Sequence, residues 1–198
     1  MAIIKSALEI AMERSKDVEA DREALEANRF VTEGKKLASK FLAEAEAQEE
    51  VDIKREIEKF DPKQRKWIKE GVLQALLANL TLPADEMSLL QGKRAAKGFA
   101  ALSSDPKQVS RLLNQIDQFL GEYLEERKRL ISAVEQRYAP TLRQKEQEMS
   151  RQVGAPVKID PMMDPGFQKM LRENLAILED RYGEAMGQAK QQLRRLCQ

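Results

Sequence analysis

The stretch VSRLLNQIDQFLGEYLEERKRLISAVEQRY, residues 109–138, carries the strongest structural signal in the chain. Its apolar residues recur alternately four and three positions apart, and Arg127 is the one interruption. These residues are Val109, Leu113, Ile116, Leu120, Tyr123, Leu130, Val134 and Tyr138. An average spacing of 3.5 residues is typical of helices that pair along a seam. The stretch therefore predicts a long helix with one apolar face.

The end of this helix is ambiguous at Pro140. Proline lacks the backbone N–H and its ring clashes with the preceding turn, so it ends or kinks a helix. However, Leu142, Met149 and Val153 keep the phase of the seam beyond the proline. We therefore expect a kinked continuation as far as Val153.

A second long apolar stripe runs from Pro165 to Cys197, and the linker GAPVKIDPMMDPG, residues 154–166, joins the two stripes. Two helices of matched length, each with one apolar face, bury those faces best against each other. Residues 105–198 are thus predicted to form a long antiparallel, coiled-coil-like helical hairpin, which suggests an elongated molecule.

The first half of the chain, residues 1–104, has shorter apolar stripes at helical spacing. Runs of Val, Ile and Thr with strict alternation are missing, so no sheet is expected. The predicted helices span residues 3–47, with a break near 15–21, then 62–80 and 84–102. The fold class predicted from the whole sequence is all-α, an elongated helical bundle that ends in the hairpin.

Composition excludes several kinds of chemistry. The chain has 34 basic and 33 acidic residues and no histidine, so the usual general base and nearly all zinc sites are absent. Cys197 is the only cysteine, so it cannot form an internal disulfide, and we expect it to fray at the end of its helix. No apolar run is long enough for a signal peptide or a membrane span. We expect a cytoplasmic protein that is not an enzyme and has no cofactor, metal or membrane.

The tetrapeptide DPKQ occurs twice, at residues 61–64 and 105–108, and Asp-Pro recurs at Asp164. Each copy precedes an apolar-periodic run. An Asp side chain can accept hydrogen bonds from the first turn, and Pro suits the first helical position. Asp61, Asp105 and Asp164 are therefore predicted helix N-caps. A repeated functional unit is the alternative, but the sequences after DPKQ diverge.

A basic segment surrounds the single tryptophan: its residues are Lys63, Arg65, Lys66, Trp67 and Lys69. One interpretation is a nucleic-acid contact, with Trp67 stacking on a base. The other is that Trp67 packs in the core while the cations face the acidic residues 44–58. Arg127, Lys128 and Arg129 would extend the nucleic-acid contact.

The linker is more apolar than a hairpin turn needs to be, because it holds Val157, Ile159, Met162 and Met163. Adaptable methionines on an exposed turn would suit a partner protein. Alternatively, the linker folds back and buries these side chains against the helices of the first half.

The sequence thus favours a protein–protein interaction or scaffold module whose partner includes a second copy of itself. The seams and the missing catalytic residue types support this hypothesis. A nucleic-acid- or ribosome-associated factor that uses the basic helix faces is the alternative.

Overall fold

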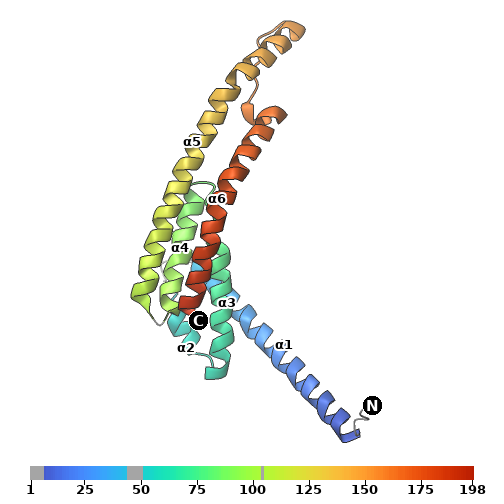
Figure 1. The fold of residues 1–198 in the computed structure, drawn as a ribbon, viewed down its shortest axis with the longest axis vertical. Helices are drawn as coiled ribbons and strands as arrows, with labels where there is room; N and C mark the ends of the chain where they lie inside the picture. Colours follow the sequence, from blue (N-terminus) through green and yellow to red (C-terminus); the bar gives the residue numbers. More distant parts are fainter. Residues whose placement is uncertain (1–6, 44–50, 104) are drawn as a thin grey trace, which may run out of the picture. The chain divides into compact units, whose positions relative to one another are not determined.

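The computed structural model shows a chain built from α helices (Figure 1). It describes residues 7–43, 51–103 and 105–198. Its elements are α1 (Ala7–Ala43), α2 (Ile53–Glu58), α3 (Pro62–Asn79), α4 (Glu86–Leu102), α5 (Pro106–Val153), the 3₁₀ turn η2 (Pro161–Met163) and α6 (Pro165–Cys197). No strand occurs in these residues. The all-α fold class predicted from the sequence is confirmed.

The chain divides into two compact units, and each is assembled from separate stretches. Unit 1 comprises residues 1–80, 94–109 and 194–198, and unit 2 comprises residues 81–93 and 110–193. Helices α4, α5 and α6 each contribute residues to both units. Both units thus contain residues from 1–104 and from 105–198, and the predicted division of the chain into these two regions stays a prediction.

Helix α1 runs without interruption from Ala7 to Ala43, so the break predicted near residues 15–21 is wrong. The ends of the predicted segment, residues 3–6 and 44–47, lie outside the described residues. The break was inferred from a change in the phase of the apolar residues. The sequence SKDVEAD at that point contains neither Gly nor Pro, so nothing interrupts the backbone hydrogen bonds.

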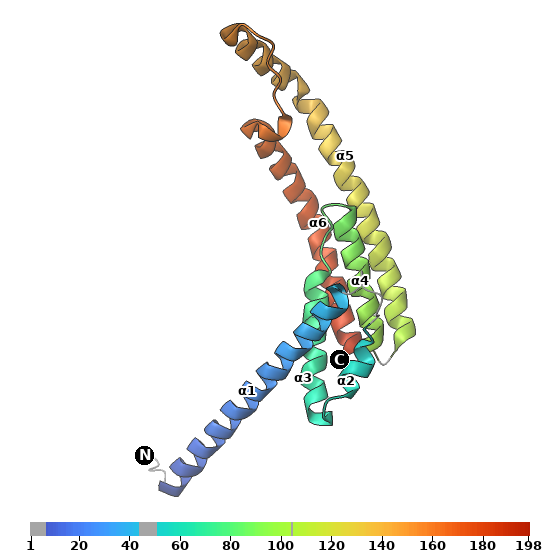
Figure 2. The same ribbon diagram turned by 180° about the vertical axis from the view of Figure 1, so that it is seen from behind.

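Within unit 1, α1 crosses α3 at two glycines (Figure 2). A Cβ atom added to Gly34 would lie 2.2 Å from the Ile68 carbonyl oxygen, and one added to Gly71 would lie 2.1 Å from the Val31 carbonyl oxygen. The two backbones touch directly, and only glycine permits that approach.

Trp67 lies beside this crossing. Its ring stacks on Phe30 of α1, with 6.0 Å between centroids and 10° between planes, and Phe60 meets Phe30 edge-on at 6.4 Å. Arg65 closes the turn between α2 and α3, because its guanidinium donates to the carbonyl oxygens of Glu58 and Phe60, each at 2.7 Å. Trp67 and Arg65 therefore both take part in the packing of unit 1.

Within unit 2, α5 and α6 lie side by side and antiparallel (Figure 1). Tyr123 of α5 contacts Tyr182 of α6 at 5.1 Å between ring centroids, whereas Tyr138, further along α5, contacts Phe167 at 5.7 Å. As residue numbers rise on α5, those of their partners on α6 fall. Coiled-coil packing of these two helices stays a prediction.

The predicted seam of α5 largely matches the buried positions, which include Val109, Ile116, Leu120, Tyr123, Val134 and Tyr138. The helix also continues through Pro140 to Val153, as the phase of the seam predicted. On α6 the buried positions include Phe167, Leu171, Leu178, Met186 and Leu193.

The predicted N-caps differ in their side chains. Asp105 accepts from the Gln108 N–H at 3.1 Å, and Asp164 accepts from the Phe167 N–H at 3.0 Å. Asp61 occupies the N-cap position of α3, but its side chain makes no capping bond. There, the backbone carbonyl of Asp61 accepts from the N–H groups of Gln64 and Arg65.

Cys197 was expected to fray at the end of its helix, and this expectation is wrong. The side chain is buried, and its sulfur lies 3.7 Å from the Phe99 carbonyl oxygen within unit 1. The neighbouring turn is held as well, because the Ser103 hydroxyl donates to the Leu196 carbonyl at 3.0 Å. Packing of these side chains overrides the tendency of helix ends to fray.

Candidate functional site

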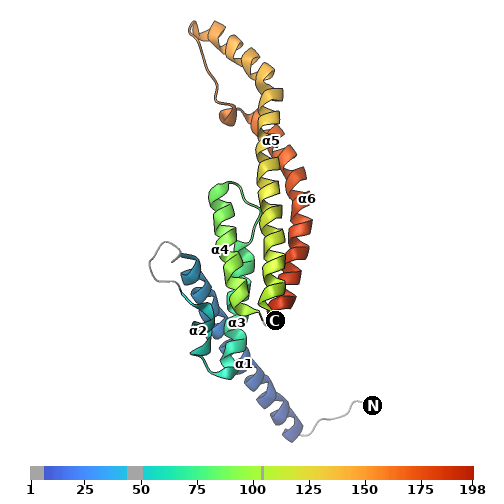
Figure 3. The same ribbon diagram turned by 90° about the vertical axis from the view of Figure 1, so that its left-hand side faces the viewer.

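The linker between α5 and α6 turns back at Gly154 and follows α5 (Figure 3). Gly154 has a φ of +75°, a left-handed conformation that glycine adopts without strain, and its N–H bonds the Ser150 carbonyl at 2.9 Å. Further along, the Val157 N–H donates to the Ser150 hydroxyl and the Ile159 N–H to the Glu146 carboxylate, both at 2.9 Å. Side chains of α5 therefore fix the backbone of the linker.

The linker then forms the short turn η2, which is anchored on both sides. Before the turn, the Asp160 carboxylate accepts from the Met162 N–H at 2.9 Å. After it, the Gln168 amide of α6 donates to the Met162 carbonyl at 2.6 Å. The turn is thus held in one conformation although much of its surface is exposed.

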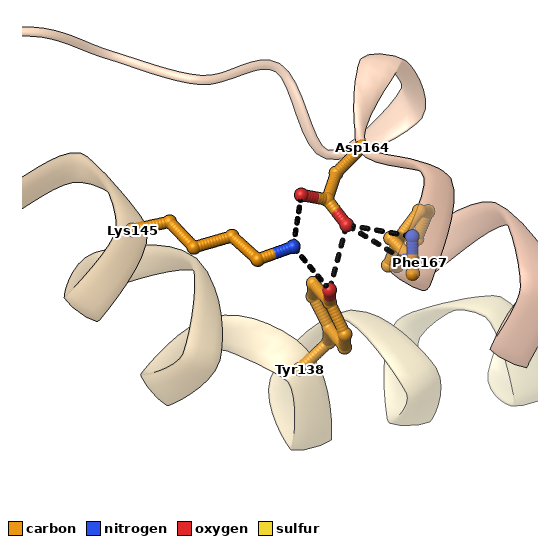
Figure 4. Close-up of polar contacts among 5 residues, drawn as sticks. Tyr138, Lys145, Asp164 and Phe167 are labelled. Carbon is orange, nitrogen blue, oxygen red and sulfur yellow. Dashed lines mark hydrogen bonds and ion pairs between the residues drawn. The ribbon is translucent and has the colours of Figure 1, made fainter. Parts of the chain in front are cut away.

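Behind the turn, Tyr138, Lys145 and Asp164 form a closed polar network (Figure 4). The Tyr138 hydroxyl donates to Asp164 Oδ1 at 2.6 Å, and the Lys145 ammonium donates to Asp164 Oδ2 at 2.5 Å and to the Tyr138 oxygen at 3.1 Å. Asp164 Oδ1 also accepts from the N–H groups of Gly166 and Phe167. This network joins the start of α6 to α5 on both sides of Pro140.

The network rests on a small apolar core of Val134, Tyr138, Phe167 and Leu171. The approach is close: a Cβ atom on Gly166 would lie 2.4 Å from the Tyr138 hydroxyl. Asp164 itself is only 5% exposed. A carboxylate at such a position must be fully hydrogen-bonded, and this one is.

The electrostatics of the network do not suit acid–base catalysis at neutral pH. The Lys145 ammonium, the Tyr138 hydroxyl and the Phe167 N–H hold the pKa of Asp164 well below its usual range. Asp164 and Tyr138 in turn raise the pKa of Lys145. Both groups stay charged around neutral pH, whereas a general acid or base works best with a pKa near the operating pH. The arrangement is that of a structural clamp.

The clamp presents apolar side chains to solvent. Met162 is 54% and Met163 is 77% exposed, while Met149 and Val153 on the last turns of α5 are also exposed. We call the two methionines of η2, Met162 and Met163, the tip surface. The other two linker residues singled out in the sequence, Val157 and Ile159, are half-buried. The linker therefore folds back, as one of the two interpretations held, but it does so along α5 and leaves both methionines exposed.

Sequence reasoning identified Asp164 as a cap and Tyr138 as a seam residue, but it missed Lys145. A usable signal was present, because Lys145 lies seven residues after Tyr138 and so on the same helix face. A lysine inside an apolar seam indicates a buried acidic partner. Arg127 interrupts the same seam and meets a different partner, since it donates to the Ala84 carbonyl at 2.9 Å.

The basic segment forms one wall of a groove of about 700 Å³ in unit 1. Arg65, Lys66, Trp67 and Lys69 line this groove together with Arg194 of α6. Arg194 is paired with Glu70, and one face of Trp67 is covered by Phe30. Lys63, Lys66 and Lys69 are exposed and form no ion pair within the described residues. Part of the acidic run, residues 44–50, lies outside them.

Of the three further basic positions, two are engaged in unit 2. Arg127 bonds Ala84, and Lys128 pairs with Glu86 at 3.1 Å and Glu125 at 3.2 Å. Arg129 is exposed. These residues do not form one continuous array of free cations.

No group of three or more Cys, Asp or Glu residues that could hold a metal ion occurs in the described part of the chain. No helix in the same residues has both the length and the apolar character needed to cross a membrane.

Residues 54–195 match the model of a family of unknown function, DUF6657. The match covers more than half of the 198 residues, so the chain belongs to this family. No curated protein and no solved structure is significantly similar to the chain.

Proposed function

We propose that this member of the family is a non-enzymatic, cytoplasmic protein-interaction module that binds another protein through the tip surface. The observation that carries the proposal is the exposure of Met162 and Met163 on a turn whose backbone is fixed on both sides. Exposed apolar side chains that the fold holds in place are typical of contact surfaces.

The exposed methionines can supply useful binding energy. Full burial of a Met side chain stabilises by about 1.5–3 kcal/mol. With 54% and 77% of the two side chains still exposed, their burial by a partner would contribute about 3 kcal/mol, or roughly 100-fold in Kd. The fixed backbone adds to this, because ordering a free residue on binding costs about 1–2 kcal/mol.

The first partner to test is a second copy of the chain, because in a two-fold dimer the exposed methionines of two tip surfaces would cover each other. Light scattering over a dilution series would compare the wild type with the double variant Met162→Ser/Met163→Ser. Ile177→Ser is the matched control, since Ile177 is 73% exposed but lies on α6 outside the tip surface. We expect the Kd of the oligomer to rise about 100-fold for each tip surface that the contact buries, and to stay unchanged in the control.

If the wild type is monomeric, the same three proteins serve as baits in nuclease-treated native lysate. The proposal then requires a defined protein that the wild type and Ile177→Ser capture and the double variant does not. Tyr138→Phe should weaken this capture as well, because it loosens the clamp behind η2 while leaving both methionines in place. If all variants had the same molar mass in light scattering and captured the same proteins, a role for the tip surface would be refuted.

A second candidate function is nucleic-acid binding in the groove of unit 1, and the exposed Lys66 and Lys69 on its wall favour it. Binding of a single-stranded RNA oligonucleotide, measured by fluorescence anisotropy, should then weaken steeply with salt, by about 0.7 log units per log unit of salt for each phosphate contacted. Lys66→Glu/Lys69→Glu should reduce both the affinity and this slope. Absence of binding at low ionic strength would exclude the candidate.

A further inference from the structure

Unit 2 contains a second feature that the tip surface does not use. A hollow of about 410 Å³ lies between α5, α6 and the residues that precede α4. Its apolar lining includes Leu82 and Met186, and its polar lining includes Tyr123, Arg127, Glu179 and Lys190. Sites for small molecules are typically of about 300–1,000 Å³ and combine apolar walls with a few convergent polar groups.

Two glycines of α6 leave this space open. Gly183 and Gly187 lie one helical turn apart, and both line the hollow. A Cβ atom added to either would meet no atom within 4 Å, unlike one added at the crowded Gly34 or Gly71. Glycine in a helix interior costs about 1 kcal/mol relative to alanine. No contact within the described chain accounts for glycine at either position.

The polar groups of the hollow converge from two helices. Arg127 interrupts the apolar seam of α5, and its guanidinium donates to the Ala84 carbonyl at 2.9 Å and lies beside the Tyr123 hydroxyl. A guanidinium carries five N–H donors, so these two partners do not use them all. Tyr123 is only 2% exposed; burial and the charge of Glu179 raise its pKa, and the nearby Arg127 opposes this shift. Burial also lowers the pKa of Lys190. Two cationic groups, one phenol and one carboxylate thus share a partly desolvated space.

We propose that this hollow binds a small organic anion that also carries a hydroxyl or amino donor. Arg127 and Lys190 would hold its acidic group, which is either a carboxylate or a phosphate. Glu179 would accept from its donor group, and the carbon skeleton would lie over Gly183 and Gly187 against Met186. The site does not depend on the tip surface, and either proposal can fail without the other.

The test is an NMR titration of the isotope-labelled chain, followed through the backbone amides of Gly183 and Gly187. The probes are 3-phosphoglycerate and glutamate, with inorganic phosphate as a third. We expect saturable shifts at both glycines with at least one organic probe. A preference for 3-phosphoglycerate would identify a phosphorylated ligand, and a preference for glutamate would identify an amino acid.

Three variants test the assignment. Lys190→Gln removes one charge-assisted hydrogen bond and should weaken binding about tenfold or more. Gly187→Leu fills the hollow and should abolish binding without disturbing the fold, because the Cβ atom has free space. Gly121→Leu makes the same change at an open helical glycine outside the hollow and should bind normally. The proposal is overturned if no probe gives saturable shifts, or if Gly187→Leu and Lys190→Gln bind as tightly as Gly121→Leu does.

Discussion

Gly71→Ala at the crossing of α1 and α3 tests the packing of unit 1 with the smallest possible change. The added methyl group would be placed 2.1 Å from the Val31 carbonyl oxygen and 3.0 Å from the Gly34 Cα. Both atoms belong to the backbone, so no side chain can rotate away. The helices would have to separate by about 1 Å to restore a normal van der Waals distance.

Two opposing effects set the size of the change in the free energy of unfolding. Alanine is favoured over glycine in a helix by about 1 kcal/mol. Overpacking costs about 1–3 kcal/mol, and a clash with rigid backbone belongs at the upper end of that range. We therefore expect a net loss of about 2 kcal/mol. Gly121→Ala is the control: its Cβ meets nothing within 4 Å, so it should gain up to about 1 kcal/mol.

The assay is urea unfolding followed by tryptophan fluorescence. Trp67 is the only tryptophan and stacks on Phe30 beside the crossing, so its signal reports on unit 1. With a urea dependence of about 1–3 kcal/mol per molar, Gly71→Ala should lower the midpoint by about 1 M. If Gly71→Ala were as stable as the wild type, or more so, the direct backbone contact between α1 and α3 would be refuted.

The remaining predictions concern the clamp and the buried thiol. Tyr138→Phe removes a hydroxyl that is hydrogen-bonded to Asp164 and Lys145. It should lower the free energy of unfolding by about 1 kcal/mol, as measured by urea unfolding followed by circular dichroism. An unchanged free energy would show that water replaces the hydroxyl. The pKa of Asp164 is lower in the folded state than in the unfolded state, so its contribution to stability is present above about pH 4 and is lost as the pH falls toward the folded-state value. In Asp164→Asn the free energy of unfolding should therefore fall less steeply as the pH drops below about 4. An unchanged fall would contradict the role of Asp164 in this pH dependence. Burial raises the pKa of Cys197 to about 11, so alkylation of the thiol should be slow in the native protein and fast in urea; fast native labelling would show that the end of α6 is open.

The extent of the helices could be predicted because it depends on residues close together in the chain. The period of the apolar residues predicted α5 through Pro140, and Asp-Pro predicted the start of α3, α5 and α6. Local patterns failed where the tertiary environment decided the outcome. A change of phase did not break α1, and packing against Phe99 kept Cys197 from fraying.

The candidate site was predictable only in part. The linker and its methionines were singled out from composition, because apolar residues on a turn need an explanation, but their exposure was left open. The clamp behind them was not, since Lys145 and Asp164 are 19 residues apart and meet only when the linker folds back along α5.

Three properties could be read from the amino-acid sequence alone: the chain is helical, most of its helices begin and end where predicted, and histidine chemistry is absent. These properties follow from backbone propensity, capping and composition, which are local. The folded chain was needed to show that Gly34 meets Gly71 while Gly183 and Gly187 line an open hollow. A periodic pattern shows which face of a helix is apolar, but which two faces meet depends on packing between residues that are distant in sequence.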